Sequence, residues 1–235
     1  MKQYFFGLIF FFISGIAVFG QGQAFDRSFL RGIDRAKNGR FTEALIEFQN
    51  AERDVGSTKL SAKRSAQLNF NIGVCHFRVE NNPDAISRFE TAIALFPNYE
   101  RAHYALGMAA LAVSNWPRAE RAFLTALKIN ETNGETWFDI AFVYLATGKM
   151  LEAKHAFETA LKFKTVDAAT AHNNVGVVNA SLGDRRGAQR SFTDALRVSG
   201  GRYEIAEANL KLITEGDALV ATAFGFGKQR NFFGE

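Results

Sequence analysis

Apolar and small residues follow a helical spacing along this 235-residue chain. The stretch DAISRFETAIALFPN places Ala85 four residues before Phe89, and Ala92 three residues after it. Offsets of four and three fall on one face of an α-helix, so the pattern predicts a helix that buries this face. The chain has only three prolines and many Phe and Ala residues, which favours helices over strands throughout.

The same triplet of alanine, phenylalanine and alanine occurs five times. Its members are Ala44, Phe48, Ala51; Ala85, Phe89, Ala92; Ala119, Phe123, Ala126; Ala153, Phe157, Ala160; and Ala188, Phe192, Ala195. The phenylalanines are separated by 41, 34, 34 and 35 residues. A small residue stands twelve positions before each triplet, namely Gly32, Gly73, Gly107, Ala141 and Gly176. The repeat predicts stacked helical pairs, because one pair cannot cover both of its own faces.

The early small residue, the later triplet and the period of about 34 residues resemble the tetratricopeptide repeat. The resemblance covers five units, 25–58, 66–99, 100–133, 134–167 and 169–202, with an insertion near 57–65. It implies an all-α, right-handed superhelical solenoid of five helical hairpins, followed by a C-terminal capping helix at 203–216. The fourth unit matches best, whereas the tryptophan position of the other units holds Ser28, Asn69, His103 and His172.

The first 24 residues differ from the rest of the chain. A lysine precedes an apolar run at 4–19 without a charged residue, and small residues follow at Gly20 and Ala24. This order is typical of a secretory signal peptide, so we expect residues 1–24 to direct export to a periplasmic or secreted location. The run of 16 residues is short for a helix that spans a bilayer. The alternative is an uncleaved membrane anchor formed by residues 4–19.

Composition and charge argue against several functions. The formal net charge of +4 is not gathered into a patch, which argues against nucleic acid as a partner. We interpret the basic stretches RAERAF and GDRRGAQR as solvated faces of second helices. The four histidines lack metal-ligand spacing, and no glycine-rich loop follows a predicted strand. The single Cys75 cannot form an internal disulfide. We therefore expect no enzyme activity, no cofactor and no metal.

The resemblance implies that the first helix of each hairpin lines a concave groove through the fifth, ninth and twelfth residues of the repeat. Most of these residues are aromatic or aliphatic, and polar residues stand at the edges. The predicted partner-binding groove comprises Phe29, Phe70, Asn71, Val74, Phe77, Arg101, Tyr104, Met108, Phe138, Asp139, Phe142 and Asn174. An apolar groove of this length exceeds what monomers normally expose, so we expect a protein or peptide segment to cover it.

Two other interpretations of the groove remain. Tighter winding of the solenoid would pack the same side chains as ordinary core. Alternatively, residues 217–226 of the aromatic and glycine-rich tail at 217–235 fold back toward the groove, or dock on a partner through their aromatic side chains.

The expected function is that of a non-catalytic scaffold or adaptor, exported from the cytoplasm, that binds a protein or peptide segment. Its resemblance to exported bacterial repeat proteins implies a role in assembly of a cell-envelope complex. The alternatives are a self-associating structural subunit and an accessory subunit of an envelope enzyme. A membrane is expected as a partner only through the N-terminal segment, if that segment is not cleaved.

Overall fold

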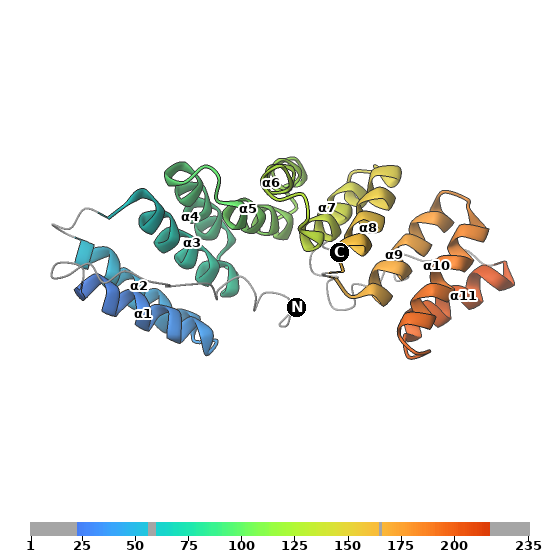
Figure 1. The fold of residues 1–235 in the computed structure, drawn as a ribbon, viewed down its shortest axis with the longest axis horizontal. Helices are drawn as coiled ribbons and strands as arrows, with labels where there is room; N and C mark the ends of the chain where they lie inside the picture. Colours follow the sequence, from blue (N-terminus) through green and yellow to red (C-terminus); the bar gives the residue numbers. More distant parts are fainter. Residues whose placement is uncertain (1–22, 56–59, 165, 217–235) are drawn as a thin grey trace. The chain divides into compact units, whose positions relative to one another are not determined.

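The computed structural model describes residues 23–55, 60–164 and 166–216, which form eleven α-helices (Figure 1). The helices are α1 (Gln23–Lys37), α2 (Phe41–Val55), α3 (Ala62–Arg78), α4 (Asn82–Leu95), α5 (Glu100–Ala112), α6 (Trp116–Ile129), α7 (Gly134–Ala146), α8 (Met150–Phe163), α9 (Ala168–Ser181), α10 (Arg185–Val198) and α11 (Glu204–Glu215). The described ranges contain no strand, so the prediction of an all-α fold is confirmed. Most of the predicted signal segment and the predicted tail lie outside the described residues.

The chain divides into two compact units, Met1–Val113 and Ser114–Glu235, called unit 1 and unit 2 below. In unit 1, α1 packs on α2 and α3 packs on α4, while α3 also contacts both α1 and α5. In unit 2, α7 packs on α8 and α9 packs on α10. We call α1, α3, α5, α7 and α9 the first helices, and α2, α4, α6, α8 and α10 the second helices. The boundary between the units falls inside the predicted third repeat.

Every first helix is followed by a residue in the left-handed backbone conformation. These residues are Gly39, Glu80, Ser114, Gly148 and Gly183, with φ between 56° and 81°. They are separated by the same intervals as the triplet phenylalanines. Glycine adopts this conformation without steric strain, whereas Glu80 and Ser114 carry a Cβ that disfavours it. One backbone geometry therefore closes the first helix of each repeat, whether or not the sequence supplies a glycine.

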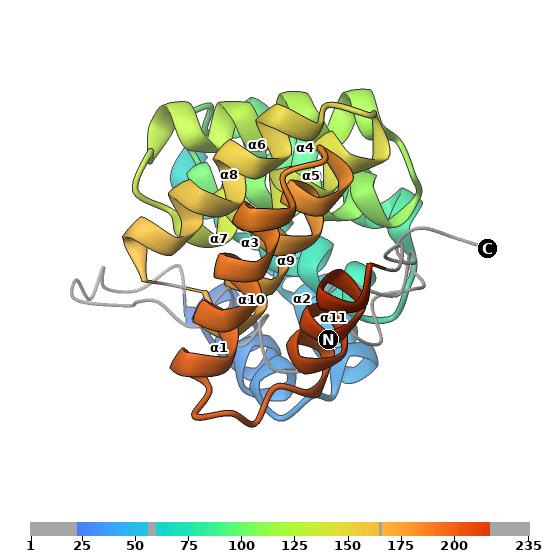
Figure 2. The same ribbon diagram turned by 90° about the vertical axis from the view of Figure 1, so that its right-hand side faces the viewer.

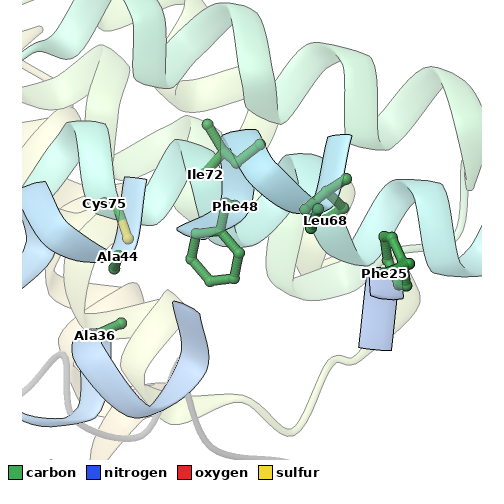
Figure 3. Packing of buried hydrophobic residues seen from close by; sticks show 8 residues of the cluster. Phe25, Ala36, Ala44, Phe48, Leu68, Ile72 and Cys75 are labelled. Carbon is green, nitrogen blue, oxygen red and sulfur yellow. The ribbon is translucent and has the colours of Figure 1, made fainter. Parts of the chain in front are cut away.

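The triplets form the buried side of each second helix. All five phenylalanines and all ten alanines have no exposed surface, which confirms their predicted burial. Phe48 of α2 belongs to one apolar cluster with Leu68, Ile72 and Cys75 of α3, and Figure 3 shows these side chains. The ring of Phe48 thus fills the space between the first and second hairpins.

Trp137 of α7 and His103 of α5 occupy equivalent repeat positions, and each ring contacts a backbone carbonyl in the loop that precedes its helix. The indole Nε1 of Trp137 donates a hydrogen bond to the carbonyl oxygen of Glu131 at 2.8 Å. His103 Nε2 lies 2.8 Å from the carbonyl oxygen of Pro97. Both acceptors are six residues upstream, so one contact recurs with two chemically different rings. The resemblance pattern marks His103 as a departure, but its ring nitrogen occupies the place of an indole N–H.

The last helix closes unit 2 by packing on α9 and α10 (Figures 1 and 2). Ile213 of α11 is buried in a cluster with Val177 and Phe192. A buried amide pair accompanies this apolar contact, since Asn209 Nδ2 donates to Asn173 Oδ1 at 2.8 Å. Arg185 of α10 also donates to the carbonyl oxygen of Ile213. Apolar burial and directed hydrogen bonds together fix the register of α11.

Candidate partner-binding faces

Aromatic residues at the fifth repeat position lie against the buried phenylalanine of the same hairpin. The ring centroids are 5.7 Å apart for Phe29 and Phe48, 5.9 Å for Phe70 and Phe89, and 5.3 Å for Phe138 and Phe157. These distances are typical of favourable aromatic pairs. The fifth-position rings therefore belong to the core on one side, and only their outer edges can face a partner.

The groove residues predicted in unit 1 fall into two groups. Phe70, Val74 and Tyr104 are buried, with 1%, 1% and 7% of their surface exposed. Asn71 is also buried, and its Nδ2 donates to the carbonyl oxygen of Gln67 at 2.8 Å. For these four residues the packing supports the alternative that they are ordinary core. The other members of the set in unit 1 are partly exposed and accessible to a partner: Phe29, Phe77, Arg101 and Met108.

Phe70 is covered by two residues that lie near the junction of α4 and α5. Its ring centroid is 5.1 Å from that of Tyr99, and the guanidinium carbon of Arg101 lies 5.2 Å from the Phe70 centroid. Burial lowers the pKa of Arg101 and raises the pKa of Tyr99, because a low-dielectric environment disfavours both charged forms. Arg101 nevertheless stays protonated near neutral pH. It presents a cation directly above an aromatic ring.

In unit 2 the predicted residues again divide by burial. Phe142 and Asn174 are buried, whereas Phe138 and Asp139 of α7 are partly exposed. Phe138, Phe142 and Phe157 form an edge-to-face cluster with centroid distances of 5.2 to 5.3 Å. Phe138 is the member of this cluster that reaches the surface. Its position is fixed by two buried rings, which reduces the side-chain entropy that binding a partner would remove.

The sequence analysis did not predict that Phe70 is covered by neighbouring side chains while Phe138 stays partly exposed. Tyr99 is the last residue of its repeat and Arg101 the second of the next, and the equivalent residues near Phe138 are Asp167 and Thr170. Asp167 instead caps α9, because its carboxylate accepts a hydrogen bond from the Thr170 amide at 2.9 Å. The signal was therefore present in the sequence, at Arg101 inside the predicted groove set and at Tyr99 and Asp167 outside it.

Basic and acidic residues are distributed unequally over the second helices. The second helices of unit 2 hold nine basic and four acidic residues. In unit 1, α2 and α4 hold two basic and six acidic residues. The small net charge of the chain therefore results from opposing charges on different helices.

Candidate chemistry is sparse in the described residues. In these ranges no group of three or more His, Cys, Asp or Glu side chains is placed to hold a metal ion. Burial raises the pKa of the Cys75 thiol to about 12, so the thiol is protonated and unreactive at neutral pH. The same ranges contain no helix that is both long and apolar enough to cross a membrane.

Within each unit the fold is that of helical hairpins, with a buried aromatic residue between them and partly exposed apolar residues on the first helices. Models of the tetratricopeptide repeat match residues 76–134 and 134–165. Residues 76–165 of the chain therefore consist of tetratricopeptide repeats. No curated protein matches the sequence significantly.

Solved structures with a similar fold include a crystal structure of the MamA protein, with a TM-score of 0.67 and 19% identity over 85% of this chain and 99% of that chain. MamA residues 41 to the end from Desulfovibrio magneticus RS-1 give a TM-score of 0.69 at 15% identity, over 78% of this chain and 99% of that one. YrrB, described as a tetratricopeptide repeat protein with an unusual peptide-binding site, gives 0.65 at 19% identity, over 79% and 91%. At these identities the likeness concerns the fold.

Proposed function

We propose that this protein is a non-catalytic scaffold that binds a peptide or protein segment on its first helices. The observation that carries the proposal is the partial exposure of Phe77 and Met108 in unit 1 and of Phe138 in unit 2. Large apolar side chains at the surface are the usual anchors of partner segments. Arg101 of α5 in unit 1 and Asp139 of α7 in unit 2 each supply a charge that would orient a segment bound to that unit.

The family supports this proposal. Tetratricopeptide repeat proteins bind their partners on extended surfaces built from successive repeats. The YrrB structure, whose description names a peptide-binding site, shares the fold. The expected partner is accordingly a segment with its own apolar anchors.

Location forms a second part of the proposal. The charge and hydropathy of residues 1–24 support export, and an exported scaffold would act in assembly of a cell-envelope complex. The assignment depends on the sequence of that segment and on family analogy. Export can be tested by determining the N-terminal residue of the protein purified from its native cells. We expect the mature protein to begin near residue 24, because the signal segment is removed on export. An intact N-terminus on protein that fractionates with the cytosol would contradict export.

Site-specific photo-crosslinking tests the binding face. A photoreactive phenylalanine analogue at Met108 is expected to capture a discrete partner segment, identified by mass spectrometry. The same analogue at Thr91, which is exposed on the second helix α4, serves as a matched control. Phe77→Gln should reduce capture at Met108 while the helical circular dichroism signal is retained. Equal capture at Met108 and Thr91 would contradict a first-helix binding face.

A further inference from the structure

The second helices of unit 2 carry basic residues in a fixed register with their buried phenylalanines. One position lies two residues before each phenylalanine and is occupied by Arg121, His155 and Arg190. Another lies five residues after and is occupied by Lys128, Lys162 and Arg197. At about 100° per residue, these positions point about 200° and 140° away from the phenylalanine. All six residues are exposed, as this geometry requires.

Two further positions complete the same helix face, because residues spaced by four, seven and eleven lie in one stripe. Six residues before the phenylalanines are Pro117, Leu151 and Arg186, and one residue after them are Leu124, Glu158 and Thr193. Leu151 and Leu124 are 68% and 44% exposed. We call these twelve residues of α6, α8 and α10 the cationic face. It holds six Lys or Arg residues and one carboxylate, that of Glu158.

The four carboxylates of these helices offset only part of the charge of their nine Lys and Arg residues. Glu158 lies 3.9 Å from Lys154, and Asp194 pairs with Arg197 at 2.9 Å. Glu120 pairs with Lys149, which lies outside the face, at 2.6 Å. The arrangement is also specific to unit 2. In unit 1, the position two residues before the phenylalanine holds Ile46 and Ser87. The position five residues after the phenylalanine holds Arg53 and Ala94.

We propose that the cationic face binds the surface of an anionic lipid bilayer. Such a surface attracts each nearby Lys or Arg, and cations spread over three helices can act together on it. The exposed Leu124 and Leu151 are the apolar side chains that interfacial binding places among the headgroups. Binding of single-stranded nucleic acid without sequence preference relies on stacked aromatic residues, and the twelve positions hold no Phe, Tyr or Trp.

Under the alternative in which residues 4–19 remain as an uncleaved anchor, the N-terminal sequence also supports the proposal. Stable peripheral attachment generally takes two signals, such as one apolar anchor combined with a polybasic surface. The apolar run at 4–19 supplies an apolar signal if it is retained, and the cationic face supplies the second. The inference goes beyond the proposed partner binding, because it concerns the second helices rather than the first.

Vesicle partitioning of the full chain tests the proposal. The probe is a pair of vesicles, one of phosphatidylcholine alone and one in which about a third of the lipid is phosphatidylglycerol. The readout is the ratio of the two partition coefficients, which cancels any insertion of the N-terminal run that does not depend on lipid charge. The test variant is Arg121→Gln/Lys128→Gln/Lys162→Gln/Arg190→Gln. Its matched control is Arg27→Gln/Arg53→Gln/Lys63→Gln/Lys211→Gln, which has the same net charge and changes exposed cations elsewhere.

The test variant should lower the ratio by at least about 100-fold, since one cation near an anionic surface contributes roughly a fivefold effect. The control should keep the ratio within about fivefold of the unaltered chain. Vesicles should also slow amide hydrogen exchange in α6 and α10 of the unaltered chain. Circular dichroism checks that both variants remain folded, as expected for substitutions at exposed residues.

Two results would overturn the proposal. One is a ratio that is the same in all three chains. The other is duplex DNA or polyglutamate that binds the cationic face, with the same sensitivity to the test variant, while anionic vesicles do not bind it. Photo-crosslinking at Met108 in the test variant measures partner binding independently of bilayer binding. Capture there should persist even where the bilayer proposal fails.

Discussion

The ring of Phe89 on α4 occupies the space that a side chain at Gly73 on α3 would need. A Cβ at Gly73 would lie 2.7 Å from Cε1 and 2.8 Å from Cδ1 of Phe89. The same relationship recurs in the first and fifth repeats, where a Cβ on Gly32 or Gly176 would come within 2.5 Å of the corresponding ring. In these three repeats the phenylalanine sixteen residues later leaves no room for a Cβ, because a buried ring packed on all sides moves little. The fourth repeat accommodates Ala141 at the same position, opposite Phe157.

Replacing this glycine should destabilise unit 1. Gly73→Ala adds a methyl group against the ring of Phe89, and such overpacking costs about 1–3 kcal/mol. Better helix propensity returns up to about 1 kcal/mol, so we expect a net loss of roughly 1–2 kcal/mol in urea unfolding. A double-mutant cycle with Phe89→Leu provides the control. If the clash is the cause, Gly73→Ala should cost less when residue 89 is the smaller leucine. Equal losses in both backgrounds would contradict this reading.

Glu80 offers the opposite test. It has a φ of 62°, where Gly39, Gly148 and Gly183 stand in the equivalent turns. Glu80→Gly should raise the free energy of unfolding by about 0.5–1 kcal/mol, because glycine removes the strain of a Cβ in this conformation. Glu80→Ala is the control that removes the carboxylate but keeps the Cβ. Stabilisation by alanine equal to that by glycine would assign the effect to charge.

The amide pair between α9 and α11 should be needed to hold the last helix. Asn209 and Asn173 are 2% and 0% exposed. Asn209→Ala removes a donor to the buried Asn173 oxygen, and an unsatisfied buried group costs about 1–3 kcal/mol. Amide hydrogen exchange in α11 should therefore become faster, while exchange in α7 is unchanged. Glu207→Ala, at an exposed position of the same helix, is the control. Unchanged α11 protection in Asn209→Ala would show that apolar contacts alone hold the helix.

The raised pKa of the buried Cys75 thiol predicts that the folded state loses stability at alkaline pH. Its folded pKa is raised by burial to about 12, above the ordinary value of 9.0. Between these values the unfolded chain releases the thiol proton and the folded chain retains it, so the free energy of unfolding falls as pH rises above 9. Urea titrations at pH 8 and pH 10 would measure the fall. Cys75→Ala, which has no ionisable group, should show a smaller fall over the same interval. A slope that is the same in both chains would assign the alkaline loss to other groups.

The sequence was sufficient to predict the helical hairpins. The triplets place small and aromatic side chains at offsets of three and four, and such offsets have one structural solution, a buried helix face. The period of about 34 residues then defines the stacking, because each hairpin leaves an apolar face that the next must cover. Both arguments use only local periodicity, and the burial of Phe48, Phe89 and Phe157 agrees with them.

Accessibility was decided only by the tertiary structure. Phe70 and Phe138 hold the same repeat position, yet Phe70 is 1% exposed and Phe138 reaches the surface. The difference arises from Tyr99 and Arg101, which come from a following segment and cover Phe70. For the cationic face, the sequence gives the positions relative to the phenylalanines, and the structure shows that the six residues at its two basic positions are exposed. Periodicity fixes which way a side chain points, but its exposure depends on neighbours that other parts of the chain bring to it.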